Sequence, residues 1–427
     1  MKVSFFWFRR DLRLHDNTGL SAALRGDSPV IPLFIFDDDI LKELPENDAR
    51  VQFIHQQLEL MHTELSKKGS SLMVRKGEPL EVWKSLLSEF EVDTVYTNGD
   101  YEPYALERDD AVQELCKEHE VGMDIFKDQV IFEKDEVLKD DGDPYVVYTP
   151  YKRKWLEHLD EVGLPEVEAA NFEQLYQQEF DLPSLSDIGF TASDISVPNY
   201  DLDRVSDYDN TRDYPAQEGT SHLSVHLRFG TVSIREMVKK AQKINETFLS
   251  ELIWREFFMQ ILYHFPRVVS NNFRSKYDGI EWRNNKEDFQ RWCDGNTGYP
   301  LVDAGMRELN ETGFMHNRVR MVTASFLCKH LLIDWRWGEA YFAEKLLDYD
   351  LSANNGNWQW AAGTGCDASP YFRIFNPSSQ LKKFDPKLLY TLKWVPEYEG
   401  FGYVEPMVEH KMARERALST YKAGIED

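Results

Sequence analysis

The chain has few of the features that mark membrane, secreted or metal-binding proteins. No apolar run approaches the roughly 20 residues needed to cross a bilayer. No N-terminal stretch pairs a basic region with an apolar core and a cleavage site. Only 4 of the 427 residues are cysteine, and none lies in a CxxC pair or in a Cys/His cluster with zinc spacing. We therefore expect a soluble protein of the cytoplasm, with reduced thiols and without a metal ion.

A glycine-rich dinucleotide loop is missing as well. No GxGxxG motif follows any of the apolar runs that could be strands. Such a loop lets the backbone approach a pyrophosphate at the start of a helix. Its absence argues against a flavin oxidoreductase with a nicotinamide site. Whatever the N-terminal part binds must be held in another way.

Positive charge is scarce overall, which at first argues against a nucleic-acid partner. The formal net charge is −25. Residues 1–210 hold 46 acidic and 21 basic side chains, whereas residues 211–427 hold 28 of each. The whole acidic excess lies in the first half, so a DNA site would have to be a local positive patch in the second half.

The first part of the chain alternates strand and helix signals. Short apolar runs that suit strands buried on both faces stand at Val3–Phe8, Val30–Phe36, Leu72–Val74, Thr94–Tyr96 and Met123–Phe126. Between them, apolar residues at spacings of three and four predict helices over residues 51–65 and 83–90. The alternation predicts an α/β domain with a doubly wound parallel sheet at residues 1–130.

The rest of the chain has a different pattern. Residues 160–210 are acidic and carry scattered prolines, which is typical of a long surface connector. From residue 211 onward the apolar residues follow helical spacing, and strand signals are scarce. We therefore predict an interdomain linker at residues 131–210 and an all-helical domain at residues 211–427.

Several segments of the second half are unusually rich in Trp, Arg, Asn and His. They are Glu251–Phe258, Thr297–Met321, Asp334–Gly338 and Asp348–Pro377, preceded by Thr211–Ser224. Together with the opening FFWFRRDLRLHDN, these segments resemble the photolyase/cryptochrome family over nearly the whole chain. Within that family the chain is most similar to bacterial class I cyclobutane pyrimidine dimer photolyases.

The resemblance implies an α/β antenna domain and a helical catalytic domain that holds FAD. It also implies a light-driven enzyme that acts on UV-damaged DNA as a monomer. In such an enzyme, reduced FAD donates an electron to a flipped-out pyrimidine dimer, and the electron returns once the ring has opened. The protein supplies positioning, a water-poor site and tuned flavin electronics.

The resemblance also assigns residues to the dimer. Trp254 would lie flat against it, Glu251 would hydrogen-bond to its base edges, and Trp360 would contact it. Glu251 and Trp254 are three residues apart in a predicted helix, so they share a face. In the stretch MHNRVRM, Asn317 and Met321 would meet substrate and flavin.

The flavin site is expected to include an Arg–Asp pair and an asparagine. Arg320 should pair with Asp348 beside the flavin ring, because an unpaired buried guanidinium is costly. By resemblance Asn354 faces flavin N5, where a neutral amide tolerates the anionic reduced flavin and an ionised carboxylate would repel it. The other expected FAD contacts are Tyr208, Thr220, Ser221, Leu223, Ser224, Arg255 and Asp350.

Two further groups complete the expected site. Trp282, Trp335 and Trp358 match the family's electron relay from the surface to the flavin, for which oxidisable indole rings are suited. The candidate phosphate contacts are Arg212, Arg318, Arg373, Lys382 and Lys383, which would give salt-sensitive DNA binding.

The antenna site departs from the family pattern. Folate-binding relatives carry an Asn-Glu pair where this chain has Tyr104 and Ala105. A folate in the usual crevice is therefore in doubt, and a deazaflavin, a second flavin, an unusual folate mode or an empty site stay open.

Two relatives with other functions are the alternatives. Photolyases specific for (6-4) photoproducts carry histidine at the positions of Asn317 and Met321, and this chain has histidine at neither position. Plant cryptochromes, which signal in blue light, carry aspartate at the position of Asn354. The sequence therefore favours repair of cyclobutane dimers over both alternatives.

Overall fold

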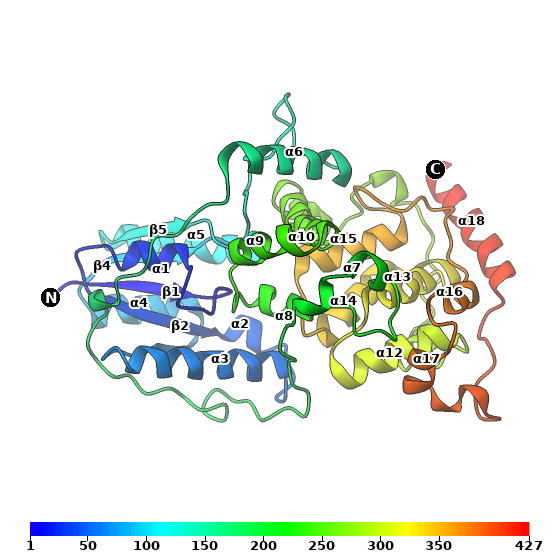
Figure 1. The fold of residues 1–427 in the computed structure, drawn as a ribbon, viewed down its shortest axis with the longest axis horizontal. Coiled ribbons are helices and arrows are strands. Elements are labelled where there is room, and N and C mark those ends of the chain that lie inside the picture. Colours follow the sequence, from blue (N-terminus) through cyan, green and yellow to red (C-terminus); the bar gives the residue numbers. More distant parts are fainter. Residues whose placement is uncertain (427) are drawn as a thin grey trace. The chain divides into compact units, whose positions relative to one another are not determined.

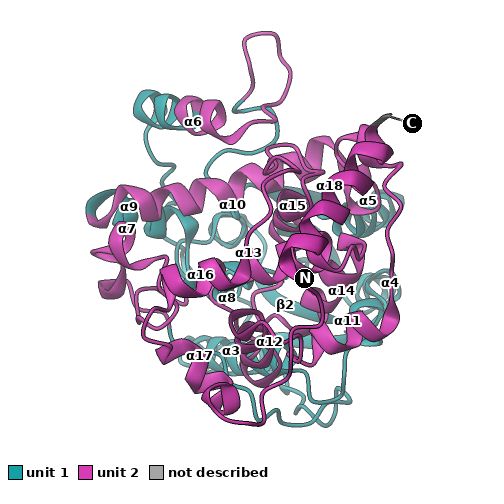
Figure 2. Ribbon diagram, turned by 90° about the vertical axis from the view of Figure 1, so that its right-hand side faces the viewer, with its two compact units in different colours: residues 1–137, 155–199, 223–243 teal, residues 138–154, 200–222, 244–427 magenta. Residues whose placement is uncertain are grey.

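In the computed structural model, which describes residues 1–426, the chain separates into two units (Figure 2). Unit 1 comprises residues 1–137, 155–199 and 223–243; unit 2 comprises the described residues of 138–154, 200–222 and 244–427. One of the crossings between units lies within helix α6 (Tyr148–Val162). The consecutive division into residues 1–130, 131–210 and 211–427 stays a prediction.

A five-stranded parallel sheet forms the centre of unit 1. Its strands are β1 (Val3–Phe8), β2 (Val30–Asp37), β3 (Met73–Gly77), β4 (Val92–Asn98) and β5 (Gly122–Phe126), in the order β3-β2-β1-β4-β5. All residues of β1 and β2 are buried, as suits sequences that are apolar at nearly every position. The order reverses between β1 and β4, so the predicted α/β class with a doubly wound parallel sheet is confirmed.

Helices alternate with these strands. They are α1 (Thr18–Ala23), α2 (Asp38–Leu41), α3 (Ala49–Ser66), α4 (Pro79–Glu89) and α5 (Pro103–Glu118), followed later in the chain by α8 (Leu223–Arg228) and α9 (Ile234–Ile244). Helix α3 runs alongside the sheet (Figure 1). Local signals set the helix starts: Asp48 caps α3 with its carboxylate, and Pro79 and Pro103 open α4 and α5.

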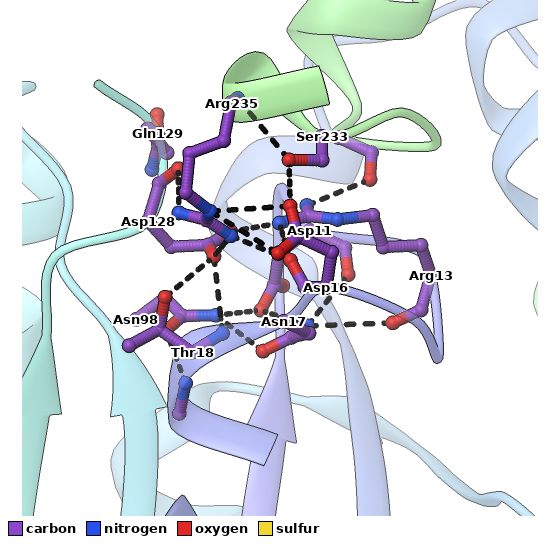
Figure 3. Close-up of polar contacts among 12 residues, drawn as sticks. Asp11, Arg13, Asp16, Asn17, Thr18, Asn98, Asp128, Gln129, Ser233 and Arg235 are labelled. Carbon is purple, nitrogen blue, oxygen red and sulfur yellow. Dashed lines mark hydrogen bonds and ion pairs between the residues drawn. The ribbon is translucent and has the colours of Figure 1, made fainter. Parts of the chain in front are cut away.

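A buried ionic cluster stabilises the end of β1 in unit 1 (Figure 3). Asp128 accepts a hydrogen bond from Arg13 at 2.7 Å and another from Arg235 of α9 at 2.8 Å. Burial opposes the charge of Asp128, yet these two guanidinium groups hold the pKa of its carboxyl below the usual range. Arg235 also bonds to Asp16 at 3.1 Å. The cluster joins the loop after β1 to α9, and removing one partner would leave a buried charge unpaired.

Unit 2 is helical. Its helices are α7 (Tyr208–Thr211), α10 (Glu246–His264), α11 (Lys286–Cys293), α12 (Pro300–Thr312), α13 (Asn317–Ser325), α14 (Trp335–Lys345), α15 (Leu351–Ala362), α16 (Pro377–Phe384), α17 (Leu389–Trp394) and α18 (His410–Glu426). A π-helix, Phe326–His330, continues α13. The core of unit 2 includes the fully buried rings of Trp292 and Trp335. None of the helices in the described part of the chain is long and apolar enough to cross a membrane.

Candidate active site

Helix α10 carries Glu251, Trp254 and Arg255. Asn245 caps its start by accepting a hydrogen bond from the Phe248 N–H. The carboxylate of Glu251 accepts a hydrogen bond from the Arg212 guanidinium at 2.5 Å. Burial raises the pKa of Glu251, and the attraction of Arg212 opposes that rise. Arg212, expected on a DNA phosphate, is thus placed as the ionic partner of Glu251.

The indole of Trp254 is half-buried among aromatic rings. The ring of Tyr148 stacks on it with centroids 3.6 Å apart and planes within 9°. Phe257 meets it edge-on at 5.5 Å, and Phe258 lies inclined by 29° at 5.4 Å. Sequence reasoning missed Tyr148, although the aromatic-rich stretch YVVYTPYKRKW was a signal that this segment packs against rings.

Helix α13 presents the residues of the MHNRVRM stretch. Asn317 is exposed, and Met321 is half-buried. Arg318, expected near DNA, forms an ion pair with Asp213 at 2.6 Å and lies 4.3 Å from the centroid of the Phe384 ring. Two of the candidate phosphate contacts, Arg212 and Arg318, therefore already have carboxylate partners within unit 2.

The predicted ion pair between Arg320 and Asp348 is confirmed. The guanidinium donates to Asp348 Oδ2 at 3.0 Å and to the backbone carbonyl of Met315 at 2.7 Å. The other carboxylate oxygen, Asp348 Oδ1, is buried and has no hydrogen-bond partner among residues 1–426. A buried acceptor without a donor is costly, so this oxygen is suited to a donor from a bound molecule.

Asn354 lies on α15, buried to 8% exposure. Its amide nitrogen donates to Glu339 of α14 twice, to the carboxylate at 2.8 Å and to the backbone carbonyl at 3.1 Å. Burial raises the pKa of Glu339, and the hydrogen bond from Asn354 opposes that rise. With its nitrogen engaged, Asn354 offers its oxygen as an acceptor. Sequence reasoning missed Glu339, which follows the DWRWG segment directly.

The three tryptophans expected to form an electron relay differ in exposure. Trp358 and Trp335 are buried at 2% and 0%, whereas Trp282 is half-buried. The Trp335 indole N–H donates to Asn272 Oδ1 at 2.9 Å, and the Trp282 ring meets Tyr421 edge-on at 5.8 Å. Two of the rings are thus buried, and only Trp282 has a part exposed at the surface. Trp360, two residues after Trp358, packs half-buried against the same core.

The remaining predicted cofactor residues are distributed over both units. Tyr208, Thr220 and Ser221 belong to unit 2, while Leu223 and Ser224 open α8 in unit 1. Two more lie on the helices already described. Asp350 caps α15 by accepting from the Ala353 N–H at 3.1 Å, and Arg255 is half-buried on α10.

The exposed candidates for phosphate contact lie around α16. Arg373 precedes this helix, and Lys382 and Lys383 stand in its last turn, all three exposed. The Lys383 ammonium lies 4.8 Å from the centroid of the Phe384 ring. These three cations, unlike Arg212 and Arg318, are exposed to an incoming polyanion.

In unit 1, the position that differs from folate-binding relatives is engaged by a neighbour. The Tyr104 hydroxyl donates to Asp37 Oδ2 at 2.7 Å, at the carboxyl end of β2. Ala105 is buried. Arg108 places its guanidinium 5.0 Å from the centroid of the Trp7 ring.

Comparison with known proteins identifies both units. A family model described as "DNA photolyase" matches residues 4–170, and one described as "FAD binding domain of DNA photolyase" matches residues 248–402. The first match covers the sheet of unit 1, and the second lies wholly within the helical unit 2. A deoxyribodipyrimidine photo-lyase of Halobacterium salinarum is 37% identical over 98% of this chain and 99% of its own length. The chain belongs to the DNA photolyase family.

Solved structures agree with this assignment. A bacterial class III photolyase from Agrobacterium tumefaciens is 35% identical, with a TM-score of 0.87 over 100% of this chain and 98% of its own. An archaeal photolyase from Sulfolobus tokodaii, described with two FAD molecules, is 36% identical, with a TM-score of 0.85 over 98% and 99%. A cryptochrome from Synechocystis is 25% identical, with a TM-score of 0.88 over 98% and 99%.

The residues of unit 2 fit a flavin. Asp348 Oδ1 is a buried acceptor that lacks a donor among residues 1–426, and the oxygen of Asn354 is available as a second acceptor. Reduced flavin rings carry N–H groups that such acceptors can bind. Arg320 supplies a nearby positive charge, paired with Asp348.

Proposed function

We propose that this protein repairs cyclobutane pyrimidine dimers in UV-damaged DNA in a light-dependent reaction. Reduced FAD, when bound, supplies the electron that opens the dimer. The proposal rests on family membership and on one observation above all, the amide nitrogen of Asn354 being held by Glu339. This orientation leaves a neutral oxygen acceptor for the N–H of a reduced flavin, and the Asn354 side chain itself adds no negative charge beside an anionic ring.

In the proposal the dimer is held by α10, α13 and α15. Glu251, whose charged form Arg212 favours, accepts hydrogen bonds from the base edges. Trp254 and Trp360 supply flat apolar surface. Asn317 and Met321 stand between dimer and cofactor.

The remaining assignments serve the cofactor and the DNA strand. Trp282, Trp335 and Trp358 would carry electrons inward to return the flavin to its reduced state. Tyr208, Thr220, Ser221, Leu223, Ser224, Arg255 and Asp350 would hold the FAD chain. Arg373, Lys382 and Lys383 would bind phosphates, while Arg212 and Arg318 would do so only by sharing or leaving their carboxylates.

Finer points belong to the same proposal. We place the chain with the class I enzymes that its motifs resemble, acting as a monomer in the cytoplasm. A second chromophore, whether folate, deazaflavin or flavin, would serve as antenna, and the Tyr104–Asp37 bond disfavours the usual folate contact. Because the chain also matches a cryptochrome, blue-light signalling is a second candidate function. Asn354 disfavours it, since plant cryptochromes carry aspartate at that position.

The test is repair of an oligonucleotide with one thymine dimer, by protein whose flavin has been reduced chemically. We expect the dimer to be lost under blue light and to remain in the dark. Chromatography of the DNA measures the amount of dimer. Glu251→Ala should lower the repair yield while FAD stays bound. Equal turnover in light and dark, or no repair by reduced holoprotein in light, would overturn the proposal. A separate measurement, extraction of the bound chromophores followed by their spectra, identifies the antenna.

A further inference from the structure

Tyr148 has no role in the function argued so far, yet it makes the closest ring stack of Trp254. The centroids lie 3.6 Å apart and the planes are within 9°. A gap of this size admits no third group, so one face of the indole is closed. Because Trp254 is still half-buried rather than buried, its accessible part lies away from Tyr148.

Tyr148 is itself fixed at both ends. Its hydroxyl lies 2.7 Å from the backbone carbonyl of Ser250 and 2.6 Å from the Ser250 hydroxyl, one helical turn before Trp254. Its backbone N–H donates to Asp367 Oδ2 at 2.9 Å. With 7% of its surface exposed, the ring cannot swing aside without breaking the hydrogen bond between its hydroxyl and the half-buried Ser250. The Tyr148 ring therefore stays in place against one face of the Trp254 indole.

We propose that Tyr148 is a positioning residue for dimer recognition: it holds the plane of Trp254 so that the opposite side of the indole meets the damaged bases. An exposed tryptophan on a helix has several rotamers, and binding a flat ligand then costs rotamer entropy. A ring stacked behind it removes that cost before the ligand arrives. The inference rests on the proposed function, since it requires Trp254 to contact the dimer.

The experiment measures binding in the dark, by anisotropy, of a labelled single strand with one thymine dimer and of the same strand undimerised. Tyr148→Leu should weaken dimer binding by about three- to tenfold, the range that an aromatic pair supplies. Tyr148→Phe, which keeps the ring, should stay within about twofold of the parent. Tyr145→Leu, in the same segment, is the matched control and should bind as the parent does. Binding of the undimerised strand should change in none of them.

A double-mutant cycle separates positioning from general loss of structure. In a Trp254→Ala background, Tyr148→Leu should have no further effect, because its role acts through the indole. A full additional loss there, or dimer binding by Tyr148→Leu equal to the parent, would overturn the inference. If Trp254→Ala alone leaves dimer binding unchanged, the proposed role of Trp254 fails, and this inference with it.

FAD content and far-ultraviolet dichroism report whether each variant folds. Should Tyr148→Leu fail to fold, Asp367→Ala tests the same stack by loosening its backbone anchor. It should weaken dimer binding by about two- to fivefold, as expected for one missing hydrogen bond, and again only when Trp254 is present. No loss in Asp367→Ala, or an equal loss without Trp254, would count against the inference.

Discussion

The side chain of Asn354 is held by Glu339 through two hydrogen bonds, one to its carboxylate and one to its backbone carbonyl. The two residues lie on adjacent helices, α15 and α14; Asn354 is buried and Glu339 is half-buried. Glu339 therefore fixes which end of the Asn354 amide stays free, and under the proposed function this free end faces the cofactor.

Replacing Glu339 with alanine removes the group that orients this amide. We expect the reduced flavin to be reoxidised by air about tenfold faster, because the freed amide no longer holds its oxygen toward the flavin N–H. Tenfold corresponds to about 1.4 kcal/mol, near the lower end of the about 1.5–3 kcal/mol that a hydrogen bond to a charged group supplies. The recovery of flavin absorbance after chemical reduction measures it. Glu344→Ala, on the exposed side of the same helix, is the control. Equal reoxidation rates in the two variants would contradict the expectation.

Arg212 favours the charged form of Glu251. Burial raises the pKa of this carboxyl and Arg212 opposes the rise, so Arg212→Met leaves the pKa higher still. A carboxyl is ionised only above its pKa, so dimer binding that uses the charged form should be lost at a higher pH than in the parent. Affinity measured over a pH series from mildly acidic to mildly basic should show the midpoint moved upward. Arg204→Met, at an exposed ion pair of unit 2, should leave the midpoint in place.

Trp358 is one of the two buried rings of the proposed relay. Trp358→Phe should abolish photoreduction of oxidised flavin, since phenylalanine is far harder to oxidise than tryptophan. Repair by chemically reduced enzyme should persist, because the relay is not used then. Flavin spectra under blue light and dimer loss measure the two separately. Trp394→Phe, a half-buried indole elsewhere in unit 2, should photoreduce normally; normal photoreduction in Trp358→Phe would remove Trp358 from the relay.

Lys329 of the π-helix is a buried cation whose charge affects stability. Its ammonium donates to the Ala362 carbonyl at 2.6 Å and lies 3.9 Å from the centroid of the Tyr421 ring. Burial lowers its pKa from 10.5 to about 7. Between these values the unfolded chain holds a proton that the folded chain lacks, so folding stability from this group rises with pH from about 7 to about 10.5.

Urea unfolding at pH 7 and at pH 9.5 tests whether folding stability rises with pH as expected. The parent should gain stability relative to Lys329→Met over that interval, by up to a few kcal/mol, since each unit of pKa difference is worth about 1.4 kcal/mol. Lys276→Met, at an exposed lysine, should follow the parent. A difference between parent and Lys329→Met that does not vary with pH would show that Lys329 stays charged when buried.

The exposed lysines of α16 should govern the salt dependence of DNA binding. Replacing Lys382 and Lys383 with alanine should reduce the slope of log affinity against log salt by about 0.7 for each phosphate of a single strand that is no longer neutralised. Dimer-containing and undamaged strands should weaken alike, because binding to phosphates carries no sequence or damage information. Lys117→Ala, on unit 1, should leave the slope unchanged.

Patterns local in sequence predicted much of the fold. The runs Val3–Phe8 and Val30–Phe36 are apolar at nearly every position, which suits strands covered on both faces, and both are buried strands. The prolines at 79 and 103 open helices because their missing N–H costs nothing there. The need of a buried guanidinium for a carboxylate supports the Arg320–Asp348 pair that the family resemblance suggested.

Contacts between residues distant in sequence were decided only by the tertiary structure. Nothing near Arg212 in the sequence shows that it bonds to Glu251, 39 residues later, rather than to solvent or phosphate. The stack of Tyr148 on Trp254 joins segments 106 residues apart in the chain numbering, and the Glu339–Asn354 bond joins two helices. Propensity and periodicity give the face of an element that is buried, whereas the partner on that face depends on how the helices pack.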